Sequence, residues 1–367
     1  MKVIISGGGT GGHIFPAIAI ANALREMDRN MEILFVGAKG RMEMEKVPAA
    51  GYKIEGLWIS GLQRRLTLDN LSFPFKVIVS IMKAKKIIKS FRPDVAVGTG
   101  GYASGPLLRV ASGMKIPSLI QEQNSFPGIT NKFLGRRVNR ICVAYEGMEK
   151  YFPKEKIIVT GNPVRQDIMS VEGKKAEAFK SFSLNPKKKT VLFLGGSLGA
   201  RTINQSVSDC MELLIHNNIQ IIWQTGQSYL PFATEVTTRL PGEDNGVRVY
   251  GFLSRMDLAY ACADVVVSRA GAISLSELAI VKKPCILVPS PNVAEDHQTK
   301  NAMALVKNEA ALFVKDSEAR EKLGKEIVAL MNDVQLQNKL SVNISRLAFP
   351  NAAVAIAKEV MQIANKK

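Results

Sequence analysis

Short runs of β-branched and other apolar residues alternate along the chain with longer segments whose apolar positions follow the helical period. The short runs predict buried strands and the longer segments predict helices. Strands that alternate with about 10–20 helical residues are typical of βαβ units and a parallel sheet. The expected strands fall into two series, first Lys2–Ser6, Glu32–Val36, Lys53–Ile59, Asp94–Gly98, Ser118–Ile120 and Arg140–Val143, then Thr190–Gly195, Ile219–Gln224, Val247–Tyr250, Asp264–Ser268, Cys285–Val288 and Ala311–Val314. Two series predict an α/β protein with two sheets.

Each series begins in the same way, with a strand, a glycine-rich turn and the start of a helix. The turns are Gly7–Gly12 and Gly195–Ala200, which indicates two Rossmann-like parallel-sheet domains. We place the boundary near Gly161-Asn162-Pro163, which gives domains over residues 1–162 and 163–349. The segment 350–367 is expected to form a separate terminal helix that packs back on the first domain.

The charge balance favours anionic partners. The chain of 367 residues has 49 Lys and Arg against 32 Asp and Glu, a net charge of +17. Such a surface suits phosphorylated substrates, nucleic acid or an anionic membrane. Aromatic residues make up only 7%, and no basic tract is interleaved with aromatic stacking positions, which weighs against nucleic acid.

Cysteine usage and hydropathy bear on the compartment. The four cysteines are far apart and form no CxxC pair, which indicates a reducing compartment and argues against structural zinc. No uncharged apolar run approaches the ~18 residues of a membrane span, and the amino terminus is not typical of a signal peptide. We therefore expect a cytosolic protein, or one that sits on a membrane from the cytosolic side.

The first glycine-rich turn is the first candidate site. Gly7, Gly9 and Gly12 fit G-x-G-x-x-G after a strand, but a dinucleotide fingerprint also needs an acid at the end of the second strand. The segment Leu34–Lys39 contains none, so we expect the turn to bind a phosphate or another anion at the helix start. His13 follows directly and suits a general base at neutral pH, the alternative being a purely structural hydrogen bond.

A second set of candidates lies in the second half. Gly195–Ala200 lacks the Lys-Ser/Thr ending of a P-loop, and Ser197 adds a hydroxyl at that helix start. Ser268–Glu277 is a further glycine-containing turn into a helix. Two helix starts suit a diphosphate, and the carboxylate of Glu277 suits ribose hydroxyls, although acids also favour the first turns of helices. We find no Asp-x-Asp pair and no metal-ligand cluster, so we expect no metal site and no cofactor.

The basic segment 64–92 predicts a membrane contact. As a helix it has one apolar stripe that can cover a sheet and a second, nearly opposite stripe of Phe75, Val79 and Met82, flanked by Lys83 and Lys86. An exposed apolar stripe bordered by lysines is typical of an element on an anionic membrane surface. The alternative is a helix that is buried on both sides.

Taken together, the motifs resemble those of a known family. Gly8-Gly9-Thr10-Gly11-Gly12-His13, Glu122-Gln123-Asn124, Gly161-Asn162-Pro163-Val164-Arg165, Gly195-Gly196-Ser197 and Gly271 through Glu277 occur in the order of the MurG family. The resemblance covers essentially the whole chain. It implies a GT-B fold, meaning two Rossmann-like domains facing across a cleft. It also implies an inverting, metal-independent transfer of N-acetylglucosamine from UDP-N-acetylglucosamine to the muramyl 4-hydroxyl of lipid I, the undecaprenyl-diphosphate-linked muramyl-pentapeptide.

The resemblance also implies residue roles and a location. His13 matches the general base, and the positions matching donor contacts are Thr10, Gly11, Gly12, Asn124, Arg165, Ser197, Leu253 (through its backbone), Ala272, Ile273, Ser274, Glu277 and Gln298. The first domain would bind the acceptor and the membrane, and the second the UDP-sugar. The protein would be peripheral, on the cytoplasmic face of the plasma membrane.

Three positions depart from the family pattern. Gln121 stands where some relatives have His, His297 replaces the first residue of a Gln-Gln pair, and Leu198 replaces a frequent Gln. Two other functions are alternatives. A UDP-sugar epimerase also has two Rossmann-like halves, but it does not require a lipid-facing stripe. A non-enzymatic anion-binding protein would not release UDP when lipid I is added.

Overall fold

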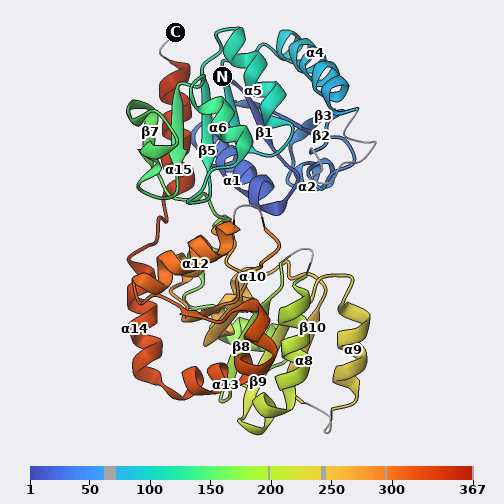
Figure 1. Ribbon diagram of the computed structural model, residues 1–367, viewed down its shortest axis with the longest axis vertical. Coiled ribbons are helices and arrows are strands. Elements are labelled where there is room, and N and C mark those ends of the chain that lie inside the picture. Colours follow the sequence, from blue (N-terminus) through green and yellow to red (C-terminus); the bar gives the residue numbers. More distant parts are fainter. Residues whose placement is uncertain (62–71, 197–198, 241–244, 294–295, 366–367) are drawn as a thin grey trace. The chain divides into compact units, whose positions relative to one another are not determined.

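The computed structural model describes residues 1–61, 72–196, 199–240, 245–293 and 296–365. They form two compact units (Figure 1). Unit 1 consists of Met1–Arg165 and Asn351–Lys367, and unit 2 consists of Gln166–Pro350. The chain thus passes between units after Arg165, whereas the sequence led us to expect the boundary after residue 162.

Unit 1 contains a parallel sheet of seven strands in the order β3-β2-β1-β4-β5-β6-β7. The strands are β1 (Lys2–Gly7), β2 (Glu32–Ala38), β3 (Lys53–Leu57), β4 (Val95–Gly100), β5 (Ser118–Glu122), β6 (Arg140–Val143) and β7 (Ile157–Val159). The helices are α1 (Gly11–Met27), α2 (Glu43–Ala49), α4 (Phe73–Phe91), α5 (Ser104–Gly113), α6 (Ile129–Gly135) and α15 (Ala352–Ala364). Short 3₁₀ helices span Met148–Lys150 and Lys154–Lys156.

Both faces of this sheet are buried, because neighbouring residues of a strand point to opposite faces. Val3 and Ile5 of β1 belong to the apolar cluster that also contains residues of α1 and α15. Ile4, between them, belongs to the cluster formed with α4, α5 and α6. Fully buried strands carry few polar positions, which is why the sequence pattern identified them as uninterrupted apolar runs.

The last helix, α15, belongs to unit 1 although the whole of unit 2, Gln166–Pro350, precedes it in the chain. It packs against α1, and Ile356 and Val360 are completely buried in the shared cluster. Glu359 of α15 also forms an ion pair with Arg140 at the start of β6, with 3.6 Å between Arg140 Nε and Glu359 Oε2.

Unit 2 contains a parallel sheet of six strands in the order β10-β9-β8-β11-β12-β13. The strands are β8 (Lys189–Leu194), β9 (Ile219–Gln224), β10 (Val247–Tyr250), β11 (Val265–Ser268), β12 (Cys285–Leu287) and β13 (Leu312–Phe313). The helices are α7 (Lys175–Ser181), α8 (Arg201–His216), α9 (Leu230–Thr238), α10 (Met256–Cys262), α11 (Ala272–Val281), α12 (His297–Lys307), α13 (Ala319–Asn332) and α14 (Val334–Ser345), with 3₁₀ turns at Gln166–Ser170 and Asp316–Glu318.

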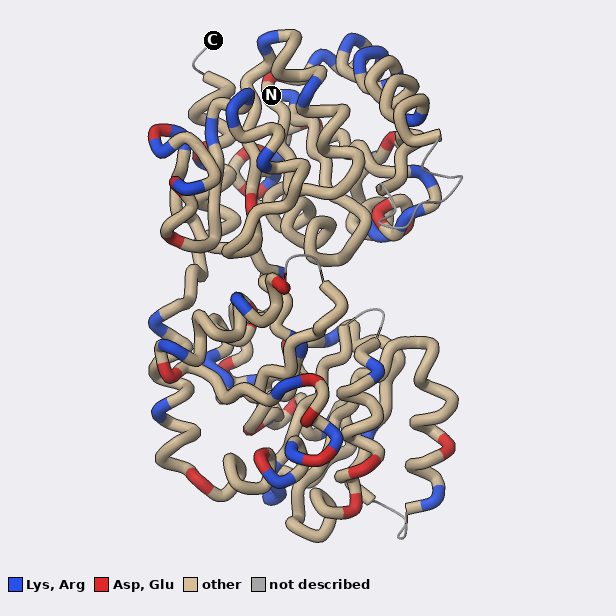
Figure 2. Tube along the Cα trace, in the orientation of Figure 1, with Lys and Arg blue, Asp and Glu red and all other residues tan. Residues whose placement is uncertain are grey.

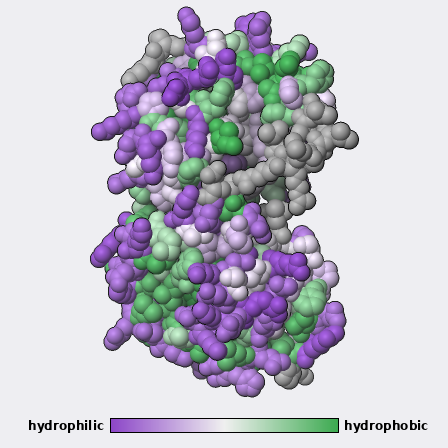
Figure 3. Space-filling model, in the orientation of Figure 1, coloured by the Kyte–Doolittle hydropathy of each residue, from purple (hydrophilic) through white to green (hydrophobic). Residues whose placement is uncertain are grey.

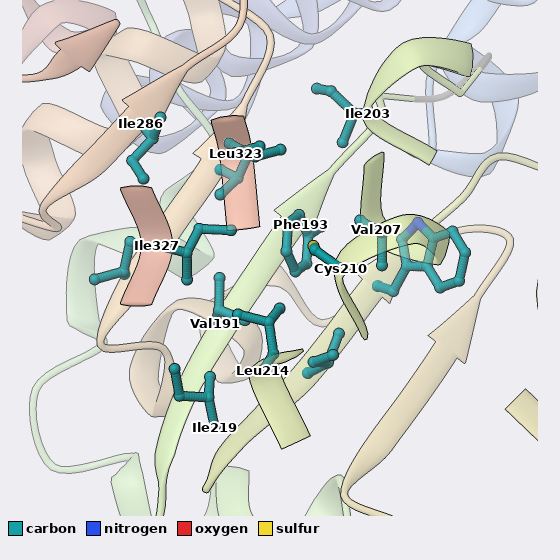
Figure 4. Close-up of a cluster of buried hydrophobic side chains, with 14 of the residues drawn as sticks. Val191, Phe193, Ile203, Val207, Cys210, Leu214, Ile219, Ile286, Leu323 and Ile327 are labelled. Carbon is teal, nitrogen blue, oxygen red and sulfur yellow. The ribbon is translucent and has the colours of Figure 1, made fainter. Parts of the chain in front are cut away.

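One face of this sheet packs against α8 and α13. Figure 4 shows Val191 and Phe193 of β8 among side chains of both helices, including Val207, Leu323 and Ile327. All five are fully buried. The alternation along β8 matches the period-2 pattern expected of a strand whose neighbours cover both faces.

One strand was missed in the sequence. β7 pairs with β6 through Ile141 and Ile157, but it has only three residues and Val159 is 40% exposed. Its β-branched run, Ile157 to Val159, is shorter than the roughly 4–8 residues by which a buried strand is identified in a sequence. The other twelve strands lie where the sequence predicted them, within a few residues at their ends.

We predict that the α15 contact stabilises unit 1. Ile356→Ala removes a fully buried side chain and should lower the free energy of unfolding of unit 1 by about 2–5 kcal/mol. The exposed Lys358→Ala on the same helix is the control and should change it by less than about 0.5 kcal/mol. Fluorescence of Trp58 in a Trp223→Phe background follows unit 1 during urea unfolding, because the chain has only two tryptophans. Equal midpoints for the two variants would contradict the contact.

Candidate active site

The strand orders place the glycine-rich loops at equivalent points of the two sheets. In unit 1, β1 has β2 on one side and β4 on the other, and in unit 2, β8 lies between β9 and β11. The chain winds away in opposite directions from these neighbouring strands, so the loops after their carboxyl ends separate and leave room for a ligand. The loops after β1 and β8 are the two turns that the sequence singled out.

A buried carboxylate holds the first loop. Glu43, at the start of α2, is completely buried, and its two oxygens accept hydrogen bonds from the amides of Gly9 and Ala38, each at 2.9 Å. The amide of Gly8 donates to the carbonyl of Gly100 at 3.4 Å. The amides of Gly8 and Gly9 are therefore already engaged by groups of the protein. Glu43 lies beyond the end of β2, where the dinucleotide fingerprint does not place an acid, so no motif in the sequence marks it.

The free donors of this loop lie at the start of α1. The amides of His13 and Ile14 both donate to the carbonyl of Thr10, at 3.1 and 3.2 Å. Helix geometry leaves the earlier amides, those of Gly11 and Gly12, without an intrahelical acceptor. The Thr10 side chain makes no capping bond and the first turn holds no acid. This arrangement suits a bound anion, and it brings together three predicted positions, Thr10, Gly11 and Gly12.

His13 lies in the first turn of α1 and is half-buried. Its Nδ1 is 3.0 Å from Oε1 of Gln123, which follows β5. Its carbonyl accepts a hydrogen bond from Thr99 Oγ1 at 2.7 Å. A Cβ on Gly100 would stand 2.8 Å from the His13 ring, so the ring packs against bare backbone at the end of β4. Residues at the ends of two neighbouring strands, β4 and β5, thus hold His13 in place.

Asn124 is held by the acid two residues before it. Glu122 is 2% exposed, and its Oε1 accepts from the Asn124 amide at 3.0 Å and from Asn124 Nδ2 at 3.3 Å. Its Oε2 accepts from the Gly128 amide and from Asn131 Nδ2. Glu122 therefore shapes the loop that carries Asn124.

Arg165 is the last residue of the first segment of unit 1. Its guanidinium carbon stands 5.3 Å from the ring centroid of Phe15 on α1, a distance at which a cation and an aromatic face attract. This contact brings Arg165 to the helix that also carries His13.

The second glycine-rich loop has a similar backbone arrangement. The amide of Gly195 donates to the carbonyl of Gln224 at 3.1 Å, and that of Gly199 to Gly196 at 3.1 Å. Gly199 has a φ of +79°, and a Cβ there would stand 2.4 Å from the carbonyl oxygen of Thr225. The helix after it, α8, begins with no side-chain cap and no acid in its first turn. Ser197, the predicted phosphate contact, lies outside the described residues.

The second helix start of unit 2 is that of α11, after the strand adjacent to β8. Its first intrahelical bond joins the Leu275 amide to the Gly271 carbonyl at 3.0 Å. The amides of the predicted residues Ala272, Ile273 and Ser274 therefore lack intrahelical acceptors. No side chain caps the helix and its first turn contains no acid.

Glu277 stands in the second turn of α11, which does not fit the alternative of a first-turn acid placed for the helix dipole. It is 7% exposed, and one of its oxygens accepts a hydrogen bond from the hydroxyl of the fully buried Tyr260 at 3.0 Å. A carboxylate fixed in this way presents a defined orientation to a ligand.

An ion pair that the sequence analysis did not find braces the loop before α11. Arg269 is paired with Asp316 and donates to the carbonyls of Val288 and Pro289. Asp316 also accepts from Thr202 in the first turn of α8 at 2.9 Å. These contacts tie the start of α8 to the loop before α11. The partners lie 114 and 47 residues apart in the sequence, so no local pattern reveals them.

Two more predicted donor contacts lie in unit 2. Leu253 has a buried side chain, 3% exposed, in the loop between β10 and α10. Gln298 lies in the first turn of α12, where its Oε1 accepts the Ser290 amide at 2.9 Å. The side-chain oxygen of Gln298 thus holds the loop after β12. The nitrogen is the other branch of the same side-chain amide.

The surface of α4 combines apolar and basic side chains. Phe75 is 61% exposed and Met82 is 68% exposed, and Figures 2 and 3 show basic and apolar positions gathered over this helix. Val79 is only partly exposed, while Ile78 is exposed and was missed. Ala84, Ile87 and Ile88 are buried against the sheet. The helix is therefore not buried on both sides.

Two further observations concern this surface. The exposed Trp58 meets Phe75 edge to face, with ring centroids 6.2 Å apart. Lys83 is half-buried and donates to the Gly56 carbonyl at 2.7 Å, so its ammonium is partly engaged, whereas Lys86 is exposed. The remainder of segment 64–92 before residue 72 lies outside the described residues.

No described helix is both long enough and apolar enough to cross a bilayer. The described residues also contain no group of three or more His, Cys, Asp or Glu side chains suited to a metal.

Comparison with known proteins defines the class. Residues 3–143 match the Glycosyltransferase family 28 N-terminal domain, and residues 190–356 match the Glycosyltransferase family 28 C-terminal domain. The two parallel-sheet units are those of a GT-B glycosyltransferase.

The relatives narrow this class. Proteins of Flavobacterium psychrophilum and Bacteroides fragilis, 54% and 53% identical to this chain, cover 99% and 100% of it over 97% and 96% of their own lengths. Both are named UDP-N-acetylglucosamine--N-acetylmuramyl-(pentapeptide) pyrophosphoryl-undecaprenol N-acetylglucosamine transferase. The crystal structure of Acinetobacter baumannii MurG aligns with a TM-score of 0.76 and 26% identity, over 98% of this chain and 99% of that one. The chain belongs to the MurG family.

Structures of another activity share the fold. UDP-GlcNAc 2-epimerase from Neisseria meningitidis aligns with a TM-score of 0.69 at 15% identity, over 99% of this chain and 100% of that one. At that identity the likeness shows the fold alone.

We predict that Glu43 is needed to shape the first loop. Glu43→Gln leaves one acceptor oxygen for two amide donors, so one buried amide loses its partner, at a cost of about 1–3 kcal/mol in unfolding free energy. The matched control is Glu45→Gln on the same helix, whose side chain is 78% exposed. Urea unfolding and hydrogen exchange at the Gly9 amide measure the effect. Equal stability and equal protection in the two variants would show that the carboxylate does not hold the loop.

Proposed function

We propose that this chain moves N-acetylglucosamine from UDP-N-acetylglucosamine to the muramyl 4-hydroxyl of lipid I and so produces lipid II, with inversion and without a metal ion. Family membership and the names of the relatives support the transfer itself. The observation that carries the residue-level proposal is the position of the loops. Each sheet presents its glycine-rich loop and an uncapped helix start at its switch point.

Unit 2 is proposed to bind the UDP portion of the donor. The amides of Ala272, Ile273 and Ser274 provide donors for the diphosphate at the positive end of α11, and the α8 start with Ser197 provides a second set. Glu277 would accept hydrogen bonds from the ribose hydroxyls. The backbone of Leu253 would contact the uracil.

The remaining donor contacts are proposed to orient the sugar and to balance charge. Asn124 and Gln298 would hydrogen-bond the sugar hydroxyls, and Arg165 would face the nucleotide. As the UDP leaves, negative charge grows on its β-phosphate, and oriented amides and a guanidinium stabilise that charge without reorganising. This is the physical basis for proposing that no metal ion is required.

His13 is proposed to be the general base. Its ring takes the proton of the acceptor hydroxyl while the hydroxyl oxygen forms a bond to the anomeric carbon and the bond from that carbon to the UDP oxygen breaks. Attack opposite to the leaving group inverts the configuration. The start of α1, with Thr10, Gly11 and Gly12, would hold the acceptor diphosphate or the donor sugar close to this ring.

The epimerase alternative is not favoured. The relatives that share more than half of their residues with this chain are named as transferases, whereas the epimerases among the structural neighbours share 13–15%. An epimerase would also have no use for the exposed apolar and basic surface of α4.

We further propose that α4 places the protein on the cytoplasmic face of the plasma membrane. Lipid I has an undecaprenyl chain that stays in the bilayer, so the enzyme must work at the membrane surface. Exposed Phe75 and Met82, with Val79 at their edge, can enter the interface, and Lys83 and Lys86 can approach anionic headgroups.

Replacing the base tests the mechanism. His13→Ala should lower kcat for transfer to a short-chain lipid I analogue by about 10²–10⁴-fold. UDP binding measured by calorimetry should change little, because the groups proposed to hold the UDP portion, Arg165 excepted, lie in unit 2. His216→Ala, an exposed histidine at the end of α8, is the control and should keep full turnover. Turnover that survives in His13→Ala would remove His13 from the role of base.

The membrane proposal is tested with vesicles. The double variant Phe75→Ser/Met82→Ser should bind vesicles of anionic lipid at least about tenfold more weakly, because fully burying one such side chain is worth about 1.5–3 kcal/mol. Phe232→Ser in unit 2, 49% exposed in the wild type, is the matched control. Cosedimentation gives the affinities. Equal binding by both variants would exclude α4 as the contact.

A further inference from the structure

A chain of three buried amide side chains leads away from the His13 ring. Gln123, Gln121 and Asn162 are each no more than 2% exposed. Gln121 Nε2 donates to Asn162 Oδ1 at 2.9 Å, and Asn162 Nδ2 donates to the Gln123 carbonyl at 3.1 Å. These hydrogen bonds link the three residues in a ring and fix the position of Gln123.

The contacts of Gln123 determine which end of its amide faces His13. One end lies 2.7 Å from the carbonyl oxygen of Thr99 and 3.2 Å from that of Gln121. A carbonyl oxygen can only accept a hydrogen bond, so this end is the NH₂ group. The same group also donates to the side-chain oxygen of Gln121. The oxygen of Gln123 is therefore the end that lies 3.0 Å from His13 Nδ1.

An amide oxygen accepts but cannot donate, so Nδ1 of the neutral ring must carry the hydrogen. We propose that Gln123 is a positioning residue that holds His13 as the Nδ1–H tautomer and leaves the lone pair of Nε2 for the acceptor proton. This inference rests on the proposed role of His13 as base. Among the described residues, Nε2 has no hydrogen-bond partner.

The backbone of Gly100, which packs against the His13 ring, supports the proposal that the ring is held in one orientation. Its φ is +104°, and a Cβ on it would come within 2.8–2.9 Å of the ring atoms Cε1 and Nδ1. The ring therefore has backbone on one side and Gln123 at Nδ1. A neutral amide orients the ring without adding a formal charge beside it, unlike the carboxylate that orients histidine in a Ser-His-Asp triad.

The tautomer can be measured directly. In protein labelled with ¹⁵N in the histidine rings, the spectrum contains only three rings, because the chain has three histidines, and His13→Ala identifies the relevant one. In the neutral ring of the wild type, Nδ1 should be protonated and Nε2 unprotonated. A protonated Nε2 in neutral His13 would overturn the proposal.

Removing the acceptor gives a second test. Gln123→Leu frees the ring to take either tautomer, so Nε2 should become protonated in part, and kcat should fall by about 10–100-fold, as for other orienting partners. The KM for UDP-N-acetylglucosamine should change by less than about twofold, since Gln123 touches the base and not the donor. Unchanged kcat and tautomer in a folded Gln123→Leu protein would also overturn the proposal.

The control is Gln220→Leu, which removes a glutamine of similar burial, 3% exposed, from unit 2. It loses stability for the same reason, since it bonds the backbone of Asn185, but it should leave the His13 spectrum unchanged. If Gln123→Leu does not fold, the wild-type spectrum alone decides. The turnover of His13→Ala tests separately whether His13 is the base. That result does not change the tautomer measured in the wild type, so failure of one proposal can be told from failure of the other.

Discussion

The start of a helix leaves backbone amides without acceptors, and this constraint governs the structure on both sheets. At α1, α8 and α11 neither a side-chain cap nor a first-turn acid satisfies those amides. The strand order then brings them to the switch point of each sheet, where neighbouring connections separate. Anionic groups of a substrate are the natural partners for such donors, and the net charge of +17 adds a long-range attraction for them.

The loops themselves are held rigid by groups that do not contact the ligand in our account. Glu43 and Glu122 are buried carboxylates whose oxygens accept backbone amides and neighbouring amide side chains. In unit 2 the ion pair of Arg269 and Asp316 holds the loop before α11 in the same way. A site that must place a base and a diphosphate accurately depends on such supports, because a loop alone would be too mobile for the required geometry.

Much of this could be predicted from local sequence. Strands buried on both faces are continuous apolar runs, and glycine-rich turns at strand ends mark the helix starts, so twelve of the strands and both loops were found. The terminal helix is similarly local. The contacts that the sequence could not show join residues far apart in the chain. Glu43 accepts a hydrogen bond from the Gly9 amide, and Gln123 contacts His13, 110 residues away. Lys83 donates to the Gly56 carbonyl. β7 has only three residues, so its run of β-branched residues was too short to identify a strand.

The central claim is that peptide amides, and not a metal ion, neutralise the pyrophosphate during transfer. The most direct test follows radiolabelled N-acetylglucosamine from its UDP donor to a short-chain lipid I analogue, with EDTA present throughout. Our account predicts that labelled lipid product forms at an undiminished rate and only when the lipid is supplied. Transfer that stops in EDTA and returns with added Mg²⁺ would contradict it.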